Sequence, residues 1–200
     1  MAILLIIPLL ISVVSVAIPS IEYYQLKKNE EVLTKDTRPK ADAQTAVIYF
    51  SRSGNTALMA QKIAAILNAD LIEIKADDYK IGPVGLVKAA MDARNHTAHI
   101  HPEKVDLSKY SKIFLGSPIW LYSPAPPIWA FARNHRFDGK DVILFNTGNS
   151  KMEQRFIDEF KEVAMKNGAQ SFDHKAIIRG RMTRQISPEE LLKQVEDMFM

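Results

Sequence analysis

The chain has 200 residues and a formal net charge of +3, from 26 basic and 23 acidic side chains. Hydrophobic residues make up 47% and charged residues 24%, values typical of a globular protein, which excludes a disordered or fibrous chain. The chain contains no cysteine, so disulfides, thiolate metal sites, iron–sulfur clusters and cysteine nucleophiles are excluded. This length predicts one folded domain with an appended segment.

The first 21 residues form the appended segment. No charged side chain occurs in residues 2–21, and this run is about long enough to cross a bilayer as a helix. We therefore expect residues 1–21 to be a transmembrane anchor. Because Lys27 and Lys28 follow it, a single-pass protein with its domain on the cytoplasmic side is favoured. Two alternatives remain open: a cleaved signal peptide of an exported protein, since residues 15–17 resemble a cleavage site, and a buried helix of the domain.

Residues 22–44 are polar and electrically balanced. They contain five basic and five acidic side chains and no sustained apolar period, which predicts a spacer between the anchor and the domain. The net charge of +3 therefore belongs to the remaining domain, residues 45–200.

From Thr45 onward, apolar runs typical of buried strands alternate with amphipathic helical segments. The predicted strands are 45–50, 70–74, 111–116, 140–146 and 174–178. The predicted helices are 56–67, 85–93, 152–166 and a C-terminal helix that begins at Ser187-Pro188. This alternation predicts an α/β fold with a parallel sheet covered on both faces. Ligands of such sheets bind at the carboxyl ends of the strands.

The loop after the first strand has the composition of an anion site. Ser51, Ser53 and Thr56 supply hydroxyls, and Gly54 permits a close backbone wrap. The amides at the start of the following helix add the favourable end of its dipole. The loop is neither a Walker loop nor a GxGxxG turn. It predicts a phosphate site, and the alternative is an ordinary helix start rich in turn-forming residues.

Three segments together resemble the flavodoxin-like family: TAVIYFSRSGNT at 45–56, IFLGSPIWLYSPAPP at 113–127 and VILFNTGNS at 142–150. Each motif lies at the end of a predicted strand, and the three occur in the family's order. The resemblance implies a three-layer α/β/α flavodoxin-like sandwich whose five-stranded parallel sheet has the order 2-1-3-4-5, here preceded by an N-terminal hydrophobic helix.

The same resemblance implies non-covalently bound FMN. The phosphate would lie against Ser51, Arg52, Ser53, Gly54, Asn55 and Thr56. The ring would lie beside Ser117, Pro118, Ile119 and Trp120, with Trp120 stacked on it, and would receive polar contacts from Asn146, Thr147, Gly148 and Asn149. Trp120 suits this role because a tryptophan offers a large rigid face to a planar ligand. The alternative is that Trp120 only covers the core, and Trp129, with its helical neighbours, is predicted to be core packing.

The resemblance favours an electron carrier that serves a redox protein partner or a small electron acceptor. One alternative is an FMN-dependent NAD(P)H:quinone-type oxidoreductase, and another is a scaffold that has the fold without the flavin. We predict no metal site at His96, His99 and His101, because they lack helical i, i+4 spacing and accompanying carboxylates. No nucleic-acid partner is expected, since no basic stripe with interleaved aromatics occurs.

Overall fold

The computed structural model describes residues 2–33, 42–181 and 183–200, with side chains described from Val16 onward. Its centre is a sheet of five parallel strands in the order β2-β1-β3-β5-β6, the order that the sequence predicts. The bounds are Thr45–Tyr49 for β1, Asp70–Glu73 for β2, Lys112–Trp120 for β3, Asp141–Gly148 for β5 and Ser171–Ile178 for β6.

A sixth strand corrects the prediction of a five-stranded sheet. Strand β4 (Ser123–Pro124) pairs antiparallel with the end of β3, where Ile119 lies opposite Pro124. The chain reverses at Leu121 and Tyr122, whose φ angles of 44° and 70° lie in the left-handed region. This tight reversal brings Ser123 back alongside Trp120.

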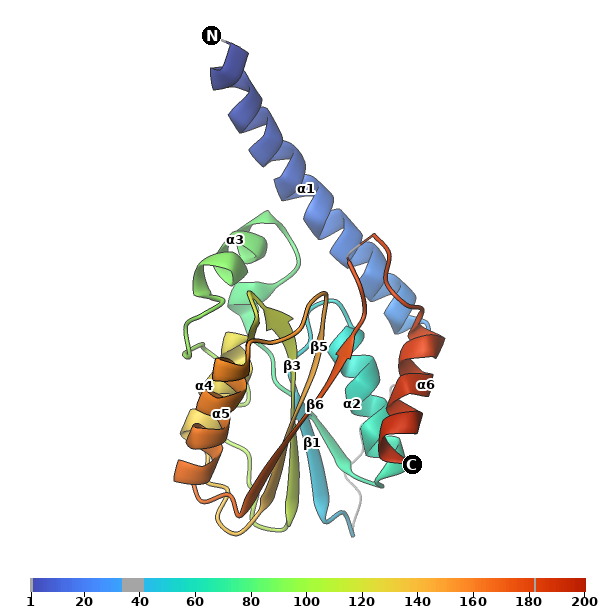
Figure 1. Cartoon of the computed structure of the whole chain (residues 1–200), viewed down its shortest axis with the longest axis vertical. Coiled ribbons are helices and arrows are strands. Elements are labelled where there is room, and N and C mark those ends of the chain that lie inside the picture. Colours follow the sequence, from blue (N-terminus) through green and yellow to red (C-terminus); the bar gives the residue numbers. More distant parts are fainter. Residues whose placement is uncertain (1, 34–41, 182) are drawn as a thin grey trace.

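Helices cover both faces of the sheet (Figure 1). Helices α2 and α6 lie on one face, and α4 and α5 lie on the other, so the domain has the predicted three layers. The bounds are Asn55–Ile66 for α2, Pro83–Asp92 for α3, Pro126–Asn134 for α4, Gln154–Lys166 for α5 and Pro188–Phe199 for α6, with a short 3-10 turn, η1, at Asp77–Tyr79. The predicted start of the last helix is confirmed, because the Ser187 hydroxyl accepts a hydrogen bond from the amide of Glu190 and Pro188 follows it.

Two apolar layers hold the sheet between its helices. Successive side chains of a strand point to opposite faces, so Ile48 and Leu115 join the cluster beneath α4 and α5, whereas Val47 and Phe114 join the cluster beneath α2 and α6. Because both faces are covered, the central strands are almost continuously apolar. The burial of these four side chains, each at most 3% exposed, fixes the positions of the strand ends.

Gly116 lets β3 and β5 lie together near the carboxyl edge of the sheet. A Cβ atom at this position would lie 2.2 Å from Cζ of the Phe145 ring. The ring therefore occupies the space that any other residue would need.

A long helix, α1 (Ala2–Glu30), precedes the domain (Figure 1). It does not end with the apolar run. Instead it continues through residues 22–30, the first part of the predicted spacer, and Asn29 in this polar part hydrogen-bonds Ser53 and Asn55. Met1 of the predicted anchor and residues 34–41 of the predicted spacer lie outside the described residues.

The predicted membrane localisation requires correction. In the part of the chain that the structure describes, no helix is long and apolar enough to cross a membrane. This finding overturns the single-pass localisation predicted from residues 2–21. The polar residues 22–30 extend the same helix, and Glu22 and Asn29 join it to the loop after β1 through contacts with Arg52 and Ser53.

Candidate functional site

The loop after β1 forms a cradle at the start of α2. Gly54 occupies the cap position with a φ of 83°, and no side chain caps the helix there. The first amides of α2 are therefore not used by a capping side chain, and the positive end of the helix dipole faces the loop. This arrangement suits an anion.

The Ser51 hydroxyl provides independent support for an anion at this loop. Among the residues that the structure describes, its Oγ is buried without a hydrogen-bond partner, which is uncommon for a buried polar atom because leaving it unpaired costs about 1–3 kcal/mol. An acceptor oxygen of a phosphate would satisfy it. The residues of this loop therefore fit a phosphate group.

Arg52 carries the positive charge of the loop, and its partner comes from α1. Arg52 Nη2 lies 3.0 Å from Glu22 Oε2, and the two side chains are 5% and 14% exposed. Burial raises the pKa of the Glu22 carboxyl, and the nearby Arg52 opposes that rise. Burial has the opposite effect on the base, because it lowers the pKa of the Arg52 guanidinium. The pair places a carboxylate at the loop where an anion would bind.

The end of β3 supplies the apolar wall of the site. Trp120 is half-buried, and its ring is held edge-on by Phe50 at 5.7 Å and by Tyr79 at 5.2 Å between ring centroids. These edge-to-face contacts fix the indole. Ser117 lies deeper, where its Oγ accepts a hydrogen bond from the amide of Ala125 and donates one to the carbonyl of Pro118.

The end of β5 lies beside the β1 loop and the end of β3. Thr147 Oγ1 is 2.8 Å from Thr56 Oγ1, and both residues are buried. This contact connects the first turn of α2 to β5. Asn146 donates from Nδ2 to the carbonyl of Ser117, and its Oδ1 lies 3.0 Å from His174 Nε2. Asn146 thus joins three neighbouring strands and is itself completely buried.

The β1 loop and the ends of β3 and β5 line one cavity of about 270 Å³. Eleven of the fourteen predicted site residues line it: Ser51, Arg52, Ser53, Asn55, Thr56, Pro118, Ile119, Trp120, Thr147, Gly148 and Asn149. The other three, Gly54, Ser117 and Asn146, lie outside the lining and support its walls.

The cavity also has lining residues that the sequence reasoning did not assign to the site. They are Ile18, Glu22 and Gln25 of α1, Leu86, Ala89, Ala90 and Ala93 of α3 and its end, and Leu121 and Gln185. The α1 residues have a signal in the sequence, because Ile18, Glu22 and Gln25 recur at the spacing of one helical face. That signal becomes informative only if residues 22–30 are helical.

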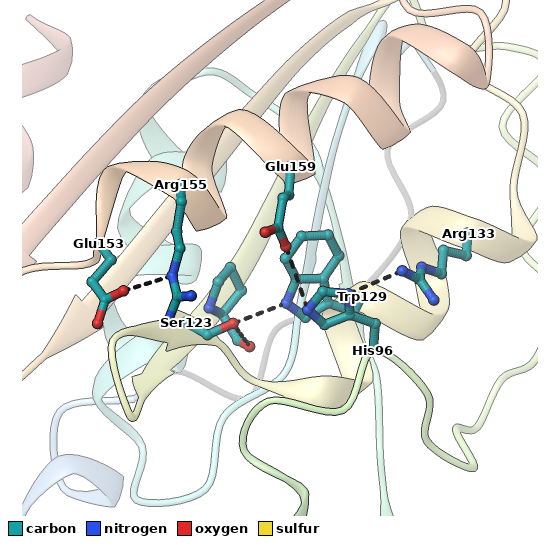
Figure 2. Close-up of polar contacts among 8 residues, drawn as sticks. His96, Ser123, Trp129, Arg133, Glu153, Arg155 and Glu159 are labelled. Carbon is teal, nitrogen blue, oxygen red and sulfur yellow. Dashed lines mark hydrogen bonds and ion pairs between the residues drawn. The ribbon is translucent and has the colours of Figure 1, made fainter.

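None of the three histidines lines this cavity, and Figure 2 shows His96 beside Trp129 and Arg133. His96 stacks on Trp129 with 3.9 Å between ring centroids, and its Nδ1 lies 2.9 Å from Arg133 Nη2. His99 and His101 are exposed, and the backbone of His101 pairs with that of Lys75. Among the described residues, no cluster of metal-ligating side chains is present.

Trp129 is a core residue, as its helical neighbours predict. It is completely buried, and its Nε1 donates a hydrogen bond of 3.2 Å to Ser123 Oγ (Figure 2). Burial and the positive charge of Arg133 lower the pKa of the stacked His96, and Glu159 opposes that shift.

Comparison with known proteins agrees with this architecture. A model of the family described as Flavodoxin matches residues 44–197. No curated protein matches the chain. A candidate flavoprotein from Bacteroides uniformis superimposes with a TM-score of 0.60 at 22% identity, covering 77% of this chain and 98% of that one. A flavoprotein from Lactobacillus acidophilus in complex with FMN superimposes with a TM-score of 0.54 at 24% identity, covering 66% of this chain and 93% of that one.

Proposed function

Because this chain belongs to the flavodoxin family, we propose that it binds FMN in the cavity at the ends of β1, β3 and β5 and transfers electrons. The observation that carries the proposal is the convergence of three unlike segments, the β1 loop and the ends of β3 and β5, on this cavity. One presents groups suited to a phosphate, one presents an aromatic wall, and one presents polar backbone. FMN needs these three kinds of surface.

The β1 loop would hold the phosphate. Ser51 Oγ is buried and unpaired, and α2 begins without a capping side chain. Ser53, Asn55 and Thr56 also line the cavity. Asn55 and Thr56 are held by hydrogen bonds to neighbouring side chains, so the loop needs little ordering when an anion binds.

The wall from Pro118 to Trp120 would orient the flavin ring. The Trp120 indole is held by two aromatic neighbours, so it can stack on a planar ligand at little entropic cost. On the other side, Thr147, Gly148 and Asn149 present backbone and small polar groups. FMN, when bound, supplies the redox chemistry, and the protein orients it and controls access of water.

A carrier role is favoured over a reductase role by the exposed rim of the site. Leu121 and Tyr122 are 53% and 46% exposed, and both are held in left-handed backbone conformations at the end of the Trp120 wall. Exposed apolar and aromatic side chains beside a cofactor suit the docking of a redox partner. Their fixed reversal would let a partner approach the ring without reorganising the site.

The absorbance spectrum of the purified full chain, before and after addition of FMN, tests this proposal. We expect a yellow protein with bound FMN. A colourless chain that takes up no FMN would refute it and favour a scaffold without flavin. The role is tested by adding NADH or NADPH with a quinone. A carrier requires a separate reductase, whereas steady-state oxidation by the chain alone would establish the oxidoreductase alternative.

A further inference from the structure

One face of α1 lines the cavity that is proposed to hold FMN. Ile18, Glu22 and Gln25 line the cavity, and Asn29 continues the same helical face one turn later. Asn29 is 2% exposed. The face therefore forms part of the site, although it lies before the family-matched residues 44–197.

Asn29 hydrogen-bonds this face of α1 to the β1 loop. Its Nδ2 donates hydrogen bonds to the carbonyl of Ser53 at 2.7 Å and to Asn55 Oδ1 at 2.6 Å. Its Cβ would lie 2.8 Å from a Cβ at Gly54. The glycine therefore provides both the left-handed turn and the space for Asn29. Through these contacts, α1 is positioned on the loop that would bind phosphate.

Glu22, on the same face of α1, forms an ion pair with Arg52. The two charges are close and nearly buried, yet neither Arg52 Nη2, Arg52 Nε nor Glu22 Oε2 makes a hydrogen bond of good geometry. A buried ion pair without good hydrogen bonds recovers little of its desolvation cost. The guanidinium is thus neutralised but not well satisfied, and a phosphate oxygen would be a better acceptor for it.

We propose that Glu22 competes with the FMN phosphate for Arg52, so that α1 limits access of the cofactor to its phosphate loop. The inference rests on the proposed FMN site. Without the cofactor, the charges of Glu22 and Arg52 balance. A phosphate monoester brings about −1.5 to −2 charges, so an ionised Glu22 beside it is repelled. FMN then binds with the Glu22 carboxylate withdrawn from Arg52, and part of the binding energy is used for that withdrawal.

Titration of the full chain with FMN and with riboflavin, followed by flavin fluorescence, tests the proposal. Riboflavin has the same ring but no phosphate, so it reports the ring site alone. We expect Glu22→Gln to bind FMN about tenfold more tightly than wild type, because removing a like charge within a few ångströms gains at least about 1.4 kcal/mol. Its riboflavin affinity should equal that of wild type.

Glu30→Gln is the matched control. Glu30 lies on the same helix, is exposed, and pairs with Lys27, so its removal changes the net charge equally without touching the cavity. It should bind both ligands as wild type does. FMN affinity that is unchanged or weaker in Glu22→Gln would overturn the competition, and so would equal tightening for both ligands. If wild type bound neither ligand, the proposed function itself would fail.

Discussion

The two tryptophans show how the same side chain serves two purposes in this protein. Trp129 is completely buried, with one face covered by His96 and its indole nitrogen bonded to Ser123. Trp120 is half-buried, contacts its neighbours through ring edges, and lines the cavity. The contacts made by each ring therefore separate a packing residue from a ligand-binding residue. We expect substitutions to separate the packing role of Trp129 from the binding role of Trp120.

The largest effect is expected from truncating the buried ring. Trp129→Ala should lower the free energy of unfolding by about 3–5 kcal/mol, because it leaves a large cavity in the core. Urea denaturation measures this loss. A loss under about 1 kcal/mol would show that the Trp129 side chain is not close-packed.

Replacing the half-buried Trp120 should affect FMN binding as well as stability. Trp120→Ala is expected to cost less stability, about 2 kcal/mol, because less apolar area is lost. It should weaken FMN binding by about tenfold through loss of stacking and burial. Denaturation and fluorescence titration of the same sample measure both quantities. Unchanged FMN affinity would assign Trp120 to packing alone.

Two buried serine hydroxyls sharpen the comparison. Ser123 Oγ is bonded to Trp129, so Ser123→Ala should destabilise the fold by about 1–2 kcal/mol by leaving the indole N–H unpaired.

Ser51 Oγ has no partner among the described residues, so Ser51→Ala should leave stability unchanged or slightly raised. It should weaken FMN at least about tenfold, the value of a hydrogen bond to a charged group. Riboflavin binding should not change, and a loss there equal to that for FMN would contradict the phosphate role of Ser51.

The smallest effect is the pH dependence contributed by His96. Because its pKa is lowered in the folded state, the unfolded chain binds the proton first, at the ordinary value of about 6.5. Stability should therefore fall as the pH drops below about 6.5. His96→Gln should reduce this fall without abolishing it, because burial also lowers the pKa values of His135 and His174. Denaturation curves at several pH values measure the slopes, and identical slopes would contradict this role of His96.

Much of the site was predictable because its residues occur at or directly after the ends of apolar runs typical of buried strands. Ser51 follows such a run, Pro118 and Thr147 lie in the extensions of β3 and β5 beyond the predicted strands 111–116 and 140–146, and parallel strands bring such ends together. The reversal at Leu121 and Tyr122 was not predictable, because neither residue type favours a left-handed backbone. The sixth strand depends on that reversal and was therefore missed.

The contribution of α1 could not be derived from local pattern. Glu22, Gln25 and Asn29 occur in a polar, charge-balanced segment that predicts a spacer. Their helical spacing acquires meaning only through tertiary contacts with Arg52 and the Ser53 carbonyl. Polar helix faces that pack on a loop resemble solvated faces in sequence, because both lack an apolar stripe.

The central claim is that the cavity beside Trp120 holds FMN. Titration of the full wild-type chain with FMN, followed by quenching of flavin fluorescence, tests it most directly. The account predicts saturation at one FMN per chain, with weaker binding in Trp120→Ala and unchanged binding in a conservative Trp129→Phe variant. An absence of quenching with wild type, or equal binding by Trp120→Ala and wild type, would contradict it.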